Sequence, residues 1–139
     1  MPMKSIVVSV AGHEFEITEV PYSVRENGEH VIGADVTGRI QLKIASEFAR
    51  RGIVNGGTFK AIRKALRFKS VDLAHLLGVM PETISRWEAG ALPMPRPSWV
   101  AVAALLRDTL DGRDEVRHIL EAASKPHVMD GAVSLPLAA

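Results

Sequence analysis

The chain has 139 residues, of which 47% are hydrophobic and 24% are charged, and its formal net charge is +1 at pH 7. This length suits one domain or a small domain with an extension, and the composition excludes wholesale disorder. The absence of cysteine excludes disulfides and thiolate zinc sites and fits a reducing compartment. No apolar run reaches the roughly 18 residues of a membrane span, and no cleavable signal opens the chain, so we expect a cytoplasmic protein without a membrane partner.

The positive charge is concentrated in one part of the chain. Residues 47–70 carry seven lysines and arginines against Glu47 alone, which gives +6, whereas the remainder is net negative. A basic zone of this kind is the electrostatic footprint of a polyanion partner. A solvated helix face explains the same composition equally well.

The first part of the chain has the pattern of β-strands. Residues 5–10 are rich in β-branched side chains, and residues 13–20 alternate Phe15 and Ile17 with charged neighbours, as in a half-buried strand. The dipeptide Asn27-Gly28 lies between two further extended runs and supplies the positive φ values of a tight hairpin turn. We therefore expect two to four small strands.

From Gln41 onward the apolar residues recur at helical spacing. This helix is expected to end at Asn55-Gly56-Gly57, and Thr58 and Ser70 are suited to cap the next two helices. Pro81 suits the first position of a further helix, where a missing N–H costs nothing.

The run "ALPMPRPS" is expected to be an extended connector, because a residue that precedes a proline is pushed out of the helical region. Ser98 then caps a long helix. A last helix over about residues 114–123 is expected to bury three apolar side chains: Val116, Ile119 and Leu120. The fold class is thus α+β, with a small antiparallel β module and an amphipathic helix over residues 1–54, an all-α domain of five helices over 55–125, and a flexible tail over 126–139.

Residues 70–90 form two short predicted helices that are separated by a tight turn at Gly78-Val79. The positions at which such a pair packs on a third helix are all apolar: Leu73, Ala74, Leu77, Val79, Ile84 and Trp87. Glu82, Thr83, Ser85 and Arg86 face outward from the second helix. This is the helix-turn-helix layout, in which the second helix enters the major groove of DNA.

The segment "LRFKSVDLAHLLGVMPETISRWEAG" resembles the Cro/phage-repressor (XRE) type of helix-turn-helix, over about residues 58–107. The resemblance implies a buried structural ion pair between Arg63, on the preceding helix, and Glu88. Met80 departs from the family pattern, which favours a small polar residue there, so this helix start lacks a side-chain acceptor. Ala89 replaces a commonly polar residue near the DNA phosphates.

The longer pattern that begins "QLKIASEFARRGIVNGGTFKAIRKAL" resembles the MqsA family of antitoxins. Members place a zinc-binding module ahead of the regulator domain. In the corresponding run "VRENGE", Val24 and Asn27 stand at the two cysteine positions, which implies a degenerate, cysteine-free module held together by its strands. The resemblance implies a transcriptional regulator, and its alternative is a type II antitoxin that neutralises a cognate toxin protein through residues 1–54 and represses its own operon.

Three residues of the second short helix are candidate readers of DNA bases. The guanidinium of Arg86 matches the O6 and N7 acceptors of guanine, Glu82 can accept from cytosine N4, and the methyl of Thr83 can meet a thymine methyl. Two alternatives are open: Arg86 can pair with Glu82 one turn back, and Glu82 can serve the helix dipole alone.

Four further residues are candidates for phosphate contacts, Ser70 through the free N–H groups at the start of its helix. For Arg96, a solvated loop arginine is the alternative. These residues are Lys69, Ser70, Ser85 and Arg96.

The five histidines are scattered without ligand spacing, and no nucleophile motif or phosphate-binding loop is present. We therefore predict no enzyme activity, no cofactor and no metal. One recognition helix covers only a few base pairs, so a regulator of this kind is expected to bind a palindromic operator in double-stranded DNA as a homodimer. Packing of the final helices is the expected interface, with four candidate residues: Trp99, Leu106, Ile119 and Leu120. A protein-interaction domain that keeps the fold without binding DNA is a further alternative.

Overall fold

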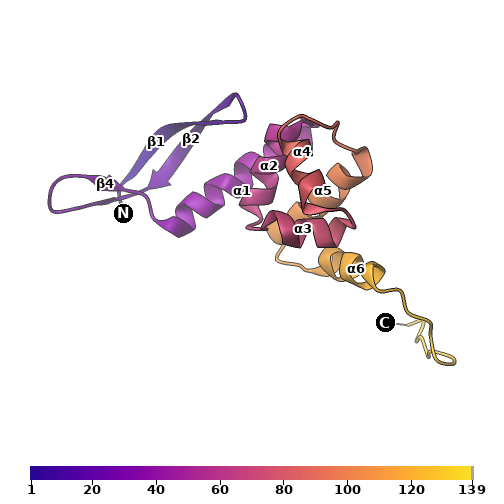
Figure 1. Ribbon diagram of the computed structural model, residues 1–139. Helices are drawn as coiled ribbons and strands as arrows, with labels where there is room; N and C mark the ends of the chain where they lie inside the picture. Colours follow the sequence, from indigo (N-terminus) through magenta and orange to yellow (C-terminus); the bar gives the residue numbers. More distant parts are fainter. Residues whose placement is uncertain (139) are drawn as a thin grey trace.

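The computed structural model describes residues 1–138 and confirms the predicted α+β class, with short strands followed by helices (Figure 1). The strands form two separate antiparallel pairs, β1 with β2 and β3 with β4. The elements are β1 (Met3–Val10), β2 (His13–Pro21), β3 (Ser23–Val24), β4 (His30–Val31), α1 (Ala34–Arg51), α2 (Gly56–Ala65), α3 (Ser70–Leu77), α4 (Pro81–Glu88), α5 (Arg96–Leu110) and α6 (Glu115–Ser124). Within this part of the chain no helix combines the length and the apolar character needed to cross a membrane.

A two-residue turn that was not predicted joins β1 to β2. Ala11 and Gly12 have φ values of 50° and 77°, and Val10 faces His13 across the turn. Two consecutive positive φ values define the turn type whose twist matches that of the strands. The pairing shifts register between Lys4 and Ile6, where Glu19 on the facing strand has a φ of 56°.

Asn27-Gly28 lies between β3 and β4 as predicted, but the connection spans residues 25–29 and is not the expected tight turn. Gly28 alone carries a positive φ, of 83°, while the Asn27 side-chain oxygen accepts a hydrogen bond from the Glu29 N–H at 3.0 Å. The rings of Tyr22 and His30 stack at 4.3 Å between centroids beside this hairpin.

Helix α1 begins at Ala34, seven residues before the predicted start at Gln41. It has two buried faces. Ile44 and Phe48 pack with Val20 of β2 in one apolar cluster, and Ala45 belongs to a second cluster formed by the remaining helices. The β module and the helical domain therefore share this helix, and the predicted boundary at residue 54 falls just after it.

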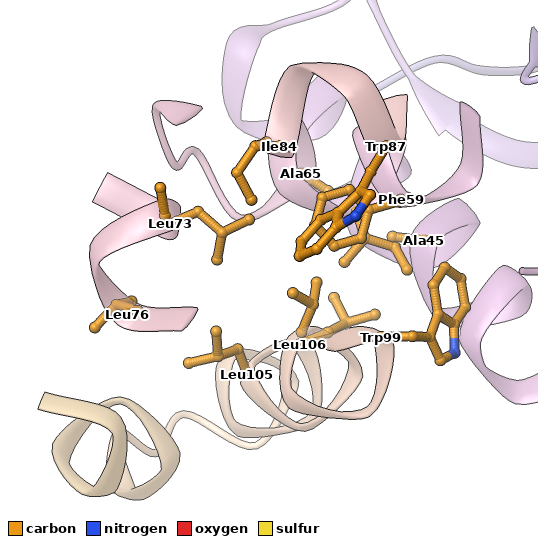
Figure 2. Close-up of a cluster of buried hydrophobic side chains, with 13 residues drawn as sticks. Ala45, Phe59, Ala65, Leu73, Leu76, Ile84, Trp87, Trp99, Leu105 and Leu106 are labelled. Carbon is orange, nitrogen blue, oxygen red and sulfur yellow. The ribbon is translucent and has the colours of Figure 1, made fainter. Parts of the chain in front are cut away.

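The helical cluster fills the space between α2, α3, α4 and α5 (Figure 2). Two of the four residues predicted for the dimer interface, Trp99 and Leu106, belong to this core, because they are only 6% and 1% exposed within a single chain. Leu120 packs at the edge of the same cluster. Ile119, which was expected to be buried, is 67% exposed, since α6 turns Val116 and Leu120 inward and leaves Ile119 on its outer side.

The cap of α2 also differs from the prediction. Asn55, rather than Thr58, is the N-cap, and its side chain accepts from the Thr58 N–H at 2.9 Å. The Thr58 hydroxyl accepts from the Asn55 N–H at 3.1 Å, so the two residues form a reciprocal capping box. Thr58 is fully buried, and its hydroxyl donates to the carbonyl of Ile53 at 2.6 Å.

The proline-rich connector is shorter than predicted. Helix α5 begins at Arg96, with Pro95 as its N-cap and Pro97 within its first turn, whereas Ser98 was expected to be the cap. Proline is tolerated in a first turn because the N–H groups there have no intrahelical acceptor.

Asp108 of α5 supplies a cap for α6 that the sequence did not suggest. Its side chain is 7% exposed, and Oδ2 accepts a hydrogen bond from the Val116 N–H at 2.7 Å. The local N-cap residue, Asp114, makes no such bond. A buried carboxylate from a neighbouring helix thus fixes the start of α6.

A close approach between α2 and the end of α4 predicts a sensitive site at Gly56. A methyl group added there would meet the carbonyl oxygen of Trp87, and that of Glu88 at 2.6 Å, both at the end of α4. We expect Gly56→Ala to lower the free energy of unfolding by about 1–3 kcal/mol through overpacking, as measured by urea denaturation. Gly57→Ala is the matched control, because the nearest atoms to its methyl belong to side chains, those of Ala11 at 3.2 Å and Asn55 at 3.3 Å. An equal loss of stability in both variants would contradict the assigned role of Gly56.

Candidate nucleic-acid interface

The turn between α3 and α4 has the geometry that the sequence predicts. Gly78 ends α3 in the left-handed conformation, with a φ of 68°, and the Val79 N–H donates to the Ala74 carbonyl at 3.0 Å. Ala74 is 1% exposed. The glycine allows the chain to reverse within two residues, and the small side chain of Ala74 lets α4 pack closely on α3.

One face of α4 is anchored in the helical cluster. Ile84 and Trp87 are 0% and 4% exposed, and both side chains point toward the residues of α2, α3 and α5 (Figure 2). The ring of Trp87 meets that of Phe59 edge-on, with centroids 5.9 Å apart. This burial fixes the rotation of α4 about its axis and so decides which residues face solvent.

The opposite face of α4 carries the predicted base-reading residues. Glu82, Ser85 and Arg86 are exposed and Thr83 is half-buried. Within residues 1–138, none of these side chains makes a hydrogen bond or an ion pair. The alternative pairing of Arg86 with Glu82 is therefore absent.

The start of α4 is held by its backbone and a proline. Met80 is the N-cap and makes no side-chain cap, as its departure from the family pattern implied, and Pro81 occupies the first turn. The Thr83 N–H donates to the Met80 carbonyl at 3.0 Å. The fixed φ of the proline favours the helical conformation at this position.

The N-cap of α3 lies one residue earlier in the chain than predicted. Lys69 is the N-cap and Ser70 is the first helical residue, so the side chain of Ser70 does not cap the helix. Lys69 is exposed and Ser70 is half-buried. Across the described residues, the N–H groups of Ser70 and Val71 have no hydrogen-bond acceptor, and the amides of such a first turn can receive an anion.

Arg96, the remaining candidate for a phosphate contact, is exposed at the first position of α5. It lies in a helix and not in the loop where the sequence analysis expected it. Its backbone is therefore fixed by the helix, while its side chain makes no ion pair within the part of the chain that the structure describes.

The ion pair implied by the family resemblance joins α2 to the end of α4. The Nε and Nη2 atoms of Arg63 donate to the two carboxylate oxygens of Glu88, each at 2.8 Å, and Nη1 donates to the Phe68 carbonyl at 3.0 Å. The side chains are 12% and 9% exposed. The hydrogen bonds to Glu88 raise the pKa of Arg63, and desolvation opposes them, so the guanidinium keeps its charge over the whole working range of pH.

The basic zone of residues 47–70 is divided by the fold. Arg50 and Arg51 pair with Glu47 at 2.9 and 2.8 Å, and their hydrogen bonds lower the pKa of that carboxyl. With Arg63 also paired, three of the seven cations are compensated. Four carry no salt bridge within residues 1–138: Lys60, Lys64, Arg67 and Lys69.

Three of these four cations lie in different surroundings. Lys64 lines a groove beside α1 and β1, and Arg67 lines a different cavity beside α5 and α6. Lys69 alone stands at the start of α3. The charge pattern of the sequence therefore overstated the basic character of the surface around α4.

No cluster of three or more His, Asp or Glu side chains suitable for a metal ion occurs within residues 1–138. Val24 and Asn27, which stand at the two cysteine positions implied by the resemblance, lie in the hairpin of β3 and β4. Comparisons of the chain with protein-family models, with curated proteins and with solved structures gave no match.

The ion pair generates a prediction about stability. Removing one partner of a buried pair leaves the other charge buried and unpaired. Arg63→Ala should therefore lower the free energy of unfolding by about 3–5 kcal/mol. Replacing both partners, as in Arg63→Met with Glu88→Leu, should recover most of that loss, and a double-mutant cycle in urea measures the coupling. Arg50→Ala is the control: its pair with Glu47 is exposed, and the expected loss is below about 1 kcal/mol. Additive effects at Arg63 and Glu88 would show that the pair contributes nothing.

Proposed function

We propose that the protein is a sequence-specific DNA-binding transcriptional regulator that uses α4 as its recognition helix. The observation that carries the proposal is the division of α4 into two faces. Ile84 and Trp87 are committed to the core, while Glu82 and Arg86 are exposed and bound to no other side chain of residues 1–138. A rigid helix that presents unpaired polar side chains suits the reading of base edges in a major groove.

The assigned roles follow from position on the helix. Arg86 donates to guanine O6 and N7, Glu82 accepts from cytosine N4, and Thr83 contacts a thymine methyl. Because Thr83 is half-buried, only part of its side chain is available to a base.

Phosphate contacts come from the surroundings of α4. Lys69 and the unpaired amides of Ser70 and Val71 lie at the start of α3, Ser85 is on α4, and Arg96 opens α5. Such contacts fix the register of the helix on the duplex without carrying sequence information.

A type II antitoxin that also represses its own operon is the second candidate, and it is supported by the sequence resemblance alone. The two functions separate cleanly in an experiment. A toxin encoded by an adjacent gene would co-purify with the antitoxin, whereas a regulator without a toxin would be recovered alone and would still footprint its own promoter.

Two substitutions test the DNA contacts. Arg86→Ala should relax the preference at one base pair, at a cost of about 1–3 kcal/mol for the preferred base, with little change in melting temperature. Lys69→Ala should weaken binding to all sequences about equally and should reduce the slope of log K against log salt by about one unit. Selection from a random DNA library and salt titration of the binding constant measure these effects.

Arg25→Ala is the matched control, because Arg25 is an exposed arginine on the distant β3–β4 hairpin. It should change neither base preference nor salt slope. Unchanged operator choice in Arg86→Ala would remove the assigned base contact. Binding of a partner that is insensitive to salt would instead favour a protein-interaction domain, since groove binding releases counterions.

A further inference from the structure

The strand β1 has an open edge. It pairs only with β2, and this sheet has two strands, so the second side of β1 has no strand neighbour within residues 1–138. Proteins usually protect such an edge with proline, with charged side chains or with a covering element. Residues 5–10 of β1, "SIVVSV", contain neither proline nor a charged residue.

The hairpin geometry identifies the backbone groups on the open edge. The two-residue turn makes Val10 and His13 the closing pair, so Val10 and every second residue before it direct their N–H and C=O groups toward β2. The alternate residues direct theirs away from β2. Backbone groups of three consecutive alternate residues thus line the open edge: Ser5, Val7 and Ser9.

The side chains of β1 alternate in the same way. Ile6, Val8 and Val10 are half-buried and face α1 and α2, whereas the alternate residues are exposed, and Val7 is 69% exposed. The buried set lines a groove of about 270 Å³ together with Ile32, which precedes α1, and apolar residues of the two helices: Ile40, Ile44, Ala61 and Ala65. An apolar groove therefore runs directly beside unpaired backbone groups.

The sequence of this edge is complementary to itself. If two copies of β1 pair antiparallel about a two-fold axis at Val7, Ser5 faces Ser9 of the second copy and Ile6 faces Val8 of the second copy. Within residues 5–9 every pair matches apolar with apolar or small polar with small polar, and although Lys4 faces Val10 of the second copy, no like charges meet. An isologous interface requires a patch that fits its own copy in this way.

We infer that two copies of this chain associate through antiparallel pairing of their β1 edges, centred on Val7, to form one continuous four-stranded sheet. The pairing gives acceptors and donors to the open backbone groups of Ser5, Val7 and Ser9. It also sets Ile6 and Val8 of the second copy beside the apolar groove. This interface does not depend on DNA binding, although its use in placing two recognition helices rests on the proposed function.

Single cysteines test the register, because the chain contains none of its own. In the inferred dimer the two residues at position 7 face each other as a hydrogen-bonded pair, with Cα atoms roughly 5.5 Å apart, which lies within the range of a disulfide. Val7→Cys should therefore form a covalent dimer rapidly under mild oxidation. Ser9→Cys is the matched control on the same exposed face, because its copies lie about four residues apart along the strand, roughly 13 Å, and should not bridge.

A charge at the axis provides a second test. Val7→Lys sets two lysines opposite each other in the dimer, and within one chain it sets the lysine opposite Glu16, the cross-strand partner of Val7. The hairpin should therefore fold, while the dimer dissociation constant should rise at least about fivefold in analytical ultracentrifugation. Val7→Thr, which keeps the β-branched shape without charge, should retain the dimer.

The outcomes separate the interface from the proposed function. Two results would overturn the inferred interface: a monomeric mass at all protein concentrations up to about 100-fold above micromolar, or equal cross-linking of Val7→Cys and Ser9→Cys. The open edge would then be available for pairing with a strand of a different protein. A dimer with the expected cross-linking that binds no DNA supports the interface and removes the regulator proposal alone. Concentration series are therefore measured without DNA.

Discussion

The contact between α2 and the end of α4 is the constraint on which the candidate interface depends. Two groups hold it: the paired side chains of Arg63 and Glu88, joined by two hydrogen bonds of 2.8 Å, and the bare backbone of Gly56 against the last carbonyls of α4. The ion pair fixes the direction of α4 relative to α2, because a guanidinium group and a carboxylate match in only a few geometries. Gly56 fixes the distance between the two helices, because it has no side chain to separate them. Together they set the orientation in which α4 presents its outer face.

Helix α1 packs against both the helical domain and the β module, and so fixes their relative position. Phe48 on one side packs under the hairpin of β1 and β2, while Ala45 on the other side packs in the helical cluster. A helix with two buried faces leaves little freedom between the units that it joins, because moving either one opens an apolar surface. Any dimer built on the β1 edge would therefore hold the two copies of α4 in a defined relation, which is what recognition of a two-fold symmetric DNA site requires.

The surface electrostatics are more local than the sequence charge implies. Pairing within the chain removes Arg50, Arg51 and Arg63 from the basic zone, and the fold directs Lys64 toward the groove beside β1. A steering field around α4 thus depends on few cations: Lys69, Arg86 and Arg96. In such a site individual contacts matter more than net charge, since fields from exposed charges fade over about 8–10 Å at physiological salt.

The sequence by itself determined the helical part and the candidate reading face, because periodicity and the Gly78 turn specify which side of a short helix is apolar. It also anticipated the pair of Arg63 and Glu88, through a motif and not through spacing. Only the tertiary structure decided that Trp99 and Leu106 belong to the core of one chain, since an apolar helical stripe does not say whether its own chain or a second copy covers it. The open edge of β1 was equally undetermined, because the number of strands in a sheet depends on long-range pairing that no local pattern encodes.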